Sequence, residues 1–103
     1  MKPFATGTVV GTGAAINVPL GWTPDHVRVL NITDMNSEDT WVAGMVDGSS
    51  MQHTGSALAN RAAPNGIALY DPKDANTPKG FTIGAGMSVS GKTLAWIAFR
   101  NVG

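Results

Sequence analysis

The chain has 103 residues, and its seven lysine and arginine residues balance seven aspartate and glutamate residues, so the formal net charge is zero. A chain of this length builds one domain with a small core. Nucleic-acid-binding proteins need an excess of basic residues to displace counterions from phosphates, and the balanced charge argues against that class. No stretch approaches the roughly 18 apolar residues of a membrane span, so we expect no membrane contact.

The sequence contains no cysteine. Small secreted domains usually depend on disulfides, because their cores are too small to stabilise them. We therefore expect a protein of a reducing compartment, or one that gains stability from assembly.

Short runs of β-branched and aromatic residues, separated by Gly, Pro, Asn and Asp, recur along the chain and predict strands. In chain order these runs are residues 8–10, 14–20, 27–32, 41–46, 67–70, 81–83, 87–89 and 93–100. No long helix is expected. The spacing predicts a single all-β domain over residues 1–103, a jelly-roll-like β-sandwich of two sheets with about seven to nine short strands.

Three segments are predicted to lie outside these strands. Residues 35–39 are polar. Residues 49–63 show no strand period and predict an irregular loop, or a short helix over residues 56–63 that Pro64 ends. Residues 1–6 predict an N-terminal arm.

The run over residues 93–100 is apolar on both faces. One face carries Leu94, Trp96 and Ala98, and the other carries Ala95, Ile97 and Phe99. A sheet with one face in water should instead alternate apolar with polar residues. Either the chain itself covers both faces, or the second face is buried against another chain.

Charge is distributed unevenly, because acidic residues exceed basic ones in residues 1–60 and the reverse holds in residues 61–103. Such halves could meet as complementary edges in a head-to-tail ring of subunits. The alternative is scattered charge in contact with solvent.

Residues 86–93 (GMSVSGKT) match the phosphate-binding loop pattern G-x-x-x-x-G-K-[ST]. That chemistry needs a helix after the loop, whose first N–H groups face the phosphates. The next residues, 94–99, are typical of a strand. We therefore interpret the segment as a glycine hairpin with an exposed Lys92.

The sequence offers no pattern of catalytic or metal-binding residues. His26 and His53 lack the accompanying ligands that a metal site needs, and no nucleophile elbow is present. We assign no catalytic, metal or cofactor-binding residue and expect a protein that is not an enzyme and has no cofactor.

Aromatic and methionine side chains are candidates for contact with a partner. Trp22, Trp41 and Trp96 could stack on sugars or anchor an interface, and Met51 could line an adaptable surface. The candidate interface residues are Lys2, Pro3, Phe4, Trp41, Met45 and Met51.

Two stretches together resemble segments of small virion proteins of tailed phages. Residues 17–31 (NVPLGWTPDHVRVLN) contain a strand that ends in Leu-Gly-aromatic, a Pro-Asp turn and an alternating valine strand. Residues 80–84 (GFTIG) and 93–99 (TLAWIAF) are similar to the closing strands of the same proteins, and the turn at residues 65–67 (NGI) lies between the two stretches.

The resemblance implies a β-sandwich that assembles on the virion. We expect a capsid decoration (cement) protein, a homotrimer that binds the phage major capsid protein on the outer capsid surface after assembly in the host cytoplasm. The alternative is a receptor- or glycan-binding module of a tail or fibre, which would use exposed aromatic residues such as Trp22 or Trp41. Neither reading includes nucleic acid or a membrane as a partner.

Overall fold

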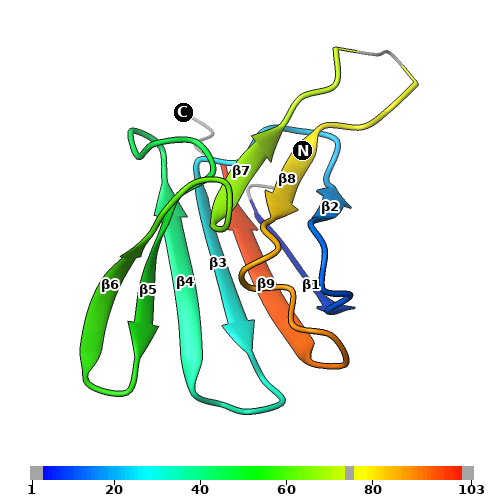
Figure 1. The fold of residues 1–103 in the computed structure, drawn as a ribbon. Helices are drawn as coiled ribbons and strands as arrows, with labels where there is room; N and C mark the ends of the chain where they lie inside the picture. The colour runs from blue at the N-terminus through cyan, green and yellow to red at the C-terminus, as the bar shows by residue number, and fades with distance from the viewer. Residues whose placement is uncertain (1–3, 74–75, 101–103) are drawn as a thin grey trace.

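The computed structural model describes residues 4–73 and 76–100 of the chain. Within these residues nine strands form two antiparallel sheets that pack face to face (Figure 1), which confirms the predicted all-β sandwich. The six-stranded sheet has the order β1 (Phe4–Val10), β9 (Thr93–Phe99), β3 (His26–Asn31), β4 (Ser37–Val42), β5 (Ser50–Thr54) and β6 (Ala57–Arg61). The three-stranded sheet has the order β2 (Ile16–Pro19), β8 (Gly80–Ile83) and β7 (Ile67–Tyr70).

The two sheets are unequal in size, with six and three strands. Strands β3 to β6 follow one another as a meander in the larger sheet. The smaller sheet lies over β1, β9, β3 and part of β4, whereas the β5–β6 hairpin extends beyond it (Figure 1). One side of the larger sheet, here called the inner face, is therefore only partly covered, and the opposite side is called the outer face.

The core lies between the smaller sheet and the inner face. From β9, Leu94, Trp96 and Ala98 point inward and are buried. Phe81 of β8 is fully buried against them, and its ring meets Trp96 edge to face with centroids 5.5 Å apart. Alternation along β9 therefore places one apolar face in the core, as a strand period of two requires.

Gly7 of β1 makes room for this core. A Cβ atom at Gly7 would lie 2.7 Å from Cζ2 of Trp96, which is the residue paired with Gly7 across the two strands. The indole therefore lies directly against the β1 backbone. A side chain at Gly7 would force the indole to move.

The prediction for residues 49–63 was wrong. These residues form the hairpin of β5 and β6, which turns at Gly55 with a positive φ of 56°. The prediction failed because the inward side chains Gln52 and Thr54 are polar and face a cleft rather than the core, so no apolar alternation marks the strands.

Four other sequence-based boundaries also need correction. Residues 37–39 belong to β4, and residues 4–6 belong to β1 rather than to an arm, while residues 1–3 lie outside the described part of the chain. β4 ends at Val42, so residues 43–46 of the strand predicted over residues 41–46 lie outside it. Residues 87–89 form no strand and belong to the connection between β8 and β9.

The segment that matched a phosphate-binding loop connects the two sheets. Because β8 and β9 belong to different sheets, the connection is a crossover and not the expected hairpin. A strand follows it instead of a helix. Lys92 is half-buried rather than exposed, and its Nζ atom lies 3.0 Å from Oδ1 of Asp34.

Candidate functional site

In the part of the chain that the structure describes, no second sheet packs against the outer face of the larger sheet. The strand register places Phe4, Phe99, His26 and Val42 side by side across β1, β9, β3 and β4. The ring centroids of Phe4 and Phe99 are 6.3 Å apart, and those of His26 and Phe99 are 5.4 Å apart. Phe4, Phe99 and Val42 are exposed in this apolar row, whereas His26 is half-buried and its Nε2 atom is shielded from solvent.

Large exposed apolar side chains in the strands of this sheet gather on its outer face. They are Phe4, Val10, Val42, Met51, Leu58 and Phe99. None of the large apolar residues on the inner face of these strands is exposed. Such a patch of exposed apolar residues on one face is typical of a surface that binds another protein.

The centre of the outer face carries one ion pair. Nη2 of Arg28 lies 2.8 Å from Oε2 of Glu38, and Nδ1 of His53 lies 3.8 Å from Oε1 of the same carboxylate. Arg28 and Glu38 come from neighbouring strands and neutralise each other. The charges of this face are therefore paired, and its other outward side chains are apolar or uncharged polar groups such as Thr6, Thr8 and Thr40, so contact with a partner should depend more on buried area than on long-range electrostatic attraction.

Two open hollows lie toward opposite ends of this face. Met45, in the turn after β4, lines a hollow of about 270 Å³ with Met51 and Leu58. A second hollow, of about 500 Å³, is lined by Leu30, Met35 and other residues around the β3–β4 turn. Flexible methionine side chains line both hollows and can adapt to the shape of a partner.

The structure separates the predicted interface residues. Phe4 and Met51 lie exposed on the outer face, and Met45 is half-buried beside Met51. Trp41 does not belong to the surface, because it is only 3% exposed and its Nε1 donates a hydrogen bond to the carbonyl of Val46. Lys2 and Pro3 lie outside the described residues.

Other outer-face residues were missed as interface candidates. Phe99 was noted as part of the second apolar face of its strand, but not as a contact residue. Val42 was likewise noted only for its place on the second apolar face of the run over residues 41–46, and Leu58 had no signal beyond its apolar character. Their shared position became clear only from the strand register.

The tryptophans do not form an open platform for sugars. Trp41 is buried in the core. Trp22 is half-buried, and the guanidinium carbon of Arg100 lies 5.5 Å from the centroid of its ring. The indole of Trp22 therefore already has a cationic side chain over one face.

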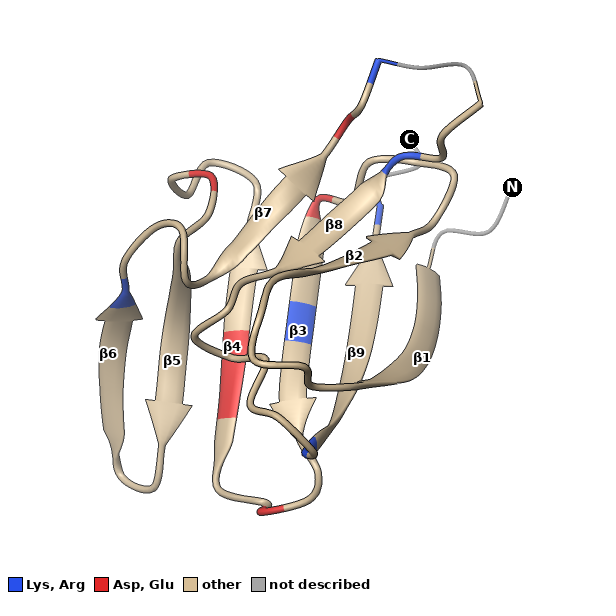
Figure 2. Ribbon diagram, turned by 45° about the vertical axis from the view of Figure 1, so that its right-hand side comes forward, with Lys and Arg blue, Asp and Glu red and all other residues tan. Residues whose placement is uncertain are grey.

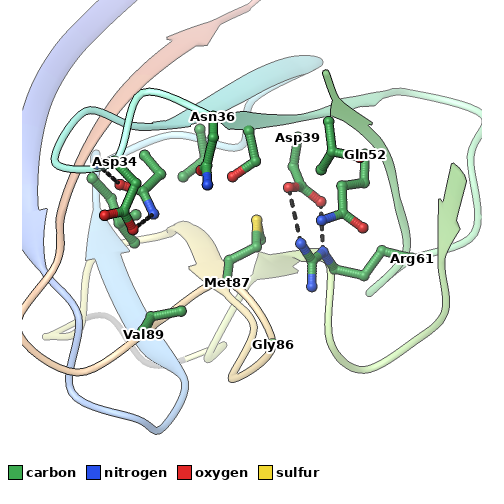
Figure 3. Close-up of a pocket in the computed structure, with 13 residues that line it drawn as sticks. Asp34, Asn36, Asp39, Gln52, Arg61, Gly86, Met87 and Val89 are labelled. Atoms are coloured by element: carbon green, nitrogen blue, oxygen red, sulfur yellow. Dashed lines mark hydrogen bonds and ion pairs between the residues drawn. The ribbon is translucent and has the colours of Figure 1, made fainter. Parts of the chain in front are cut away.

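A polar cleft lies on the uncovered part of the inner face, between β4, β5 and β6 and the β8–β9 connection (Figure 3). Its volume is about 340 Å³. Oδ2 of Asp39, a residue with only 2% exposure, lies 2.7 Å from Nε of Arg61, and Nη2 of Arg61 lies 3.3 Å from Oδ1. The hydroxyl of Ser50 also donates to Oδ2. Both carboxylate oxygens are thus engaged in joining β4 to β5 and β6, which gives Asp39 a structural role.

Ion pairs within the chain join its acidic and basic halves. Asp39 pairs with Arg61, and Asp34 pairs with Lys92. Figure 2 shows how few charged residues interrupt the strands of the larger sheet. These intrachain pairs use charges that a head-to-tail ring would need at its edges, and so they weaken the case for such a ring.

One carboxyl group has a shifted pKa. The ammonium of Lys73, 2.9 Å away, donates a hydrogen bond to Asp71 and holds the pKa of that carboxyl below its usual value. Both residues lie on the β7–β8 connection. The pair is exposed and separate from the apolar face.

In residues 4–73 and 76–100 no group of three or more His, Asp or Glu side chains is placed to hold a metal ion. The same residues contain no helix of the length and apolarity that crossing a bilayer requires. No protein-family model matches the chain, and no curated protein or solved structure is significantly similar to it.

Proposed function

We propose that this protein is a non-enzymatic virion protein that decorates and stabilises the capsid of a tailed phage. The outer face carries the proposal. It is a nearly neutral surface across the strands of one sheet, with exposed apolar side chains spread along it, and it suits binding across subunits of a major capsid protein.

The sequence resemblance supports the same reading. Residues 17–31 contribute to β2 and β3, and residues 80–84 and 93–99 contribute to β8 and β9. In the fold β2 pairs with β8, and β3 pairs with β9. The segments that resemble phage virion proteins therefore pair with one another at the centre of the sandwich, which is expected if they share a fold with those proteins.

Decoration would stabilise the shell by mass action. A protein that binds only where assembled subunits meet adds its binding free energy to the assembled state. Many copies on one shell multiply this effect. The mechanism needs only apolar contact area, and it does not depend on the homotrimer expected from the sequence, since a monomer, dimer or trimer could each place a sheet face on the shell.

A receptor- or glycan-binding module of a tail or fibre is the alternative function. This function would need exposed tryptophans for stacking on sugars. Trp41 is buried and cannot serve, and Arg100 covers one side of Trp22. The apolar outer face suits a protein partner better than a hydroxyl-rich sugar. Decoration is therefore the function that we favour.

Counting the copies of this chain in purified particles tests the proposal. We expect about one copy per major capsid subunit, as shell-wide decoration requires. Heads that lack the protein should also lose thermal stability. A handful of copies would contradict decoration and move the protein to the tail or fibre, and absence from particles would contradict any virion role.

A charge on the outer face should abolish binding to the shell. Phe99→Asp places a carboxylate in the apolar row, and we expect capsid occupancy to fall about tenfold or more at limiting protein concentration. Ala57→Asp is the matched control, because Ala57 is exposed and its pairing with Thr54 places it on the opposite side of the sheet, so this variant should retain full occupancy. Circular dichroism should show both variants folded. Equal occupancy for the two variants would contradict the use of the outer face.

A further inference from the structure

Strand β1 is an unprotected edge of the larger sheet. Within residues 4–73 and 76–100 it is first in the strand order and pairs only with β9. Figure 2 shows it at the margin of the sheet. Its seven residues, FATGTVV, include no charged residue and no proline. Natural edge strands are usually blunted by such residues or covered, because an open edge pairs readily with another strand.

The backbone groups that face outward from β1 can be identified. The N–H of Gly11 donates to the carbonyl of Lys92 at 2.8 Å, and the carbonyl of Gly11 accepts from the N–H of Gly91 at 3.1 Å. Gly11 therefore faces the β9 side. Because successive residues of a strand alternate in direction, the outward groups belong to Phe4, Thr6, Thr8 and Val10.

Residues of β1 at equal distances on either side of Gly7 are similar in type. An antiparallel pairing of two copies centred on Gly7 would set Phe4 against Val10, Ala5 against Val9, and Thr6 against Thr8. Aromatic residues paired with β-branched ones, and threonine paired with threonine, are favourable cross-strand pairs. No like charges meet in this register, since the strand has none.

The same register matches the hydrogen-bonding groups. Phe4, Thr6, Thr8 and Val10 carry the outward groups, and in this pairing each of them lies opposite another member of the set. They therefore form the hydrogen-bonded pairs of the new ladder, while Gly7 lies opposite Gly7 of the second copy in a non-hydrogen-bonded pair. A shift by one residue would lose this match.

We infer that β1 pairs with β1 of a second copy, and that the protein forms a two-fold dimer with one continuous sheet across both chains. The pairing is isologous, meaning that both chains contribute the same surface, and it satisfies the outward backbone groups of β1 in both chains. It also extends the apolar outer face, because Phe4 and Val10 of both copies lie on that side. This inference goes beyond the proposed function and does not depend on it, and it replaces the expected homotrimer with a dimer.

Sedimentation velocity on the full chain over a range of concentrations tests the dimer. We expect the wild type to sediment as a dimer. Thr6→Lys combined with Thr8→Lys sets two introduced lysines against each other at both symmetry-related pairs, and we expect dimerisation to weaken about tenfold or more. Both positions are exposed, so the fold should be retained.

A charge-matched variant separates pairing from general disruption. Thr6→Lys combined with Thr8→Glu places opposite charges in the same two pairs, and the dimer should return. Thr40→Lys puts a lysine at the centre of the outer face and away from β1, and it should leave the dimer intact.

Several outcomes would overturn the inference. They are a wild type that stays monomeric at all concentrations, a trimer or larger species, a dimer that survives the double-lysine variant, and a dimer that Thr40→Lys dissociates. The last would assign self-association to the sheet face. None of these results depends on capsid binding. The dimer hypothesis can therefore be rejected while capsid decoration is supported, and decoration can be rejected while the dimer is supported.

Discussion

Phe81→Ala is expected to lower the free energy of unfolding by about 3–5 kcal/mol, the usual cost of truncating a fully buried aromatic residue. Phe81 has no exposed surface and fills the space between the two sheets. Its edge-to-face contact with Trp96 would also be lost. A domain of this size has a small core and little net stability, so the variant should be close to unfolding at room temperature.

Urea denaturation, followed by tryptophan fluorescence, measures this loss. Phe99→Ala is the matched control, because it removes the same side chain from the outer face, where Phe99 is 40% exposed. We expect the control to cost less, about 1–2 kcal/mol, because part of the ring already lies in water and its removal leaves no enclosed cavity. Equal losses for the two variants would mean that the core does not lie between the sheets.

The sequence predicted the central strands because the chain itself buries one of their faces. Residues 93–99 combine a buried row with β-branched and aromatic residues, and they form the strand that was expected. The β5–β6 hairpin had no such signal. It extends beyond the smaller sheet, so no apolar period was required, and its strands are held by pairing with β4 and by the turn at Gly55.

Only part of the apolar outer face could be predicted from the sequence. The second apolar face of residues 93–100 indicated either coverage by the chain or burial against a partner. In the structure Phe99 is exposed on that face, and the chain's own smaller sheet covers only the opposite one. Sequence reasoning also chose Trp41 over Val42 as a contact residue. Both are apolar neighbours on one strand, and only the register shows which of them points outward.

The ion pair beneath the cleft could not have been predicted. Asp39 lies in a polar segment that indicated a loop, and its partner Arg61 is 22 residues away in a segment that indicated a loop or helix. Only the pairing of three consecutive strands brings the two side chains together. A polar contact of this kind produces no periodic pattern by which it could be recognised in a single sequence.

That ion pair gives the second large effect, because Asp39→Asn should destabilise the protein by about 3–5 kcal/mol, as removal of one partner of a buried pair does. The asparagine keeps the shape of the side chain but removes the charge that neutralises Arg61. The Arg61 side chain is only 16% exposed. The variant would therefore leave a largely buried guanidinium without its counter-charge.

Glu38→Gln is the matched control from the same strand. Glu38 points to the outer face and pairs with Arg28, whose side chain is 40% exposed, so its loss should cost less than about 1 kcal/mol. Combining Asp39→Asn with Arg61→Leu tests the physical cause. If the penalty comes from the uncompensated guanidinium, the double variant should be more stable than Asp39→Asn alone in urea denaturation. A double variant that is less stable than the single one would show instead that Arg61 stabilises the hairpin through contacts other than Asp39.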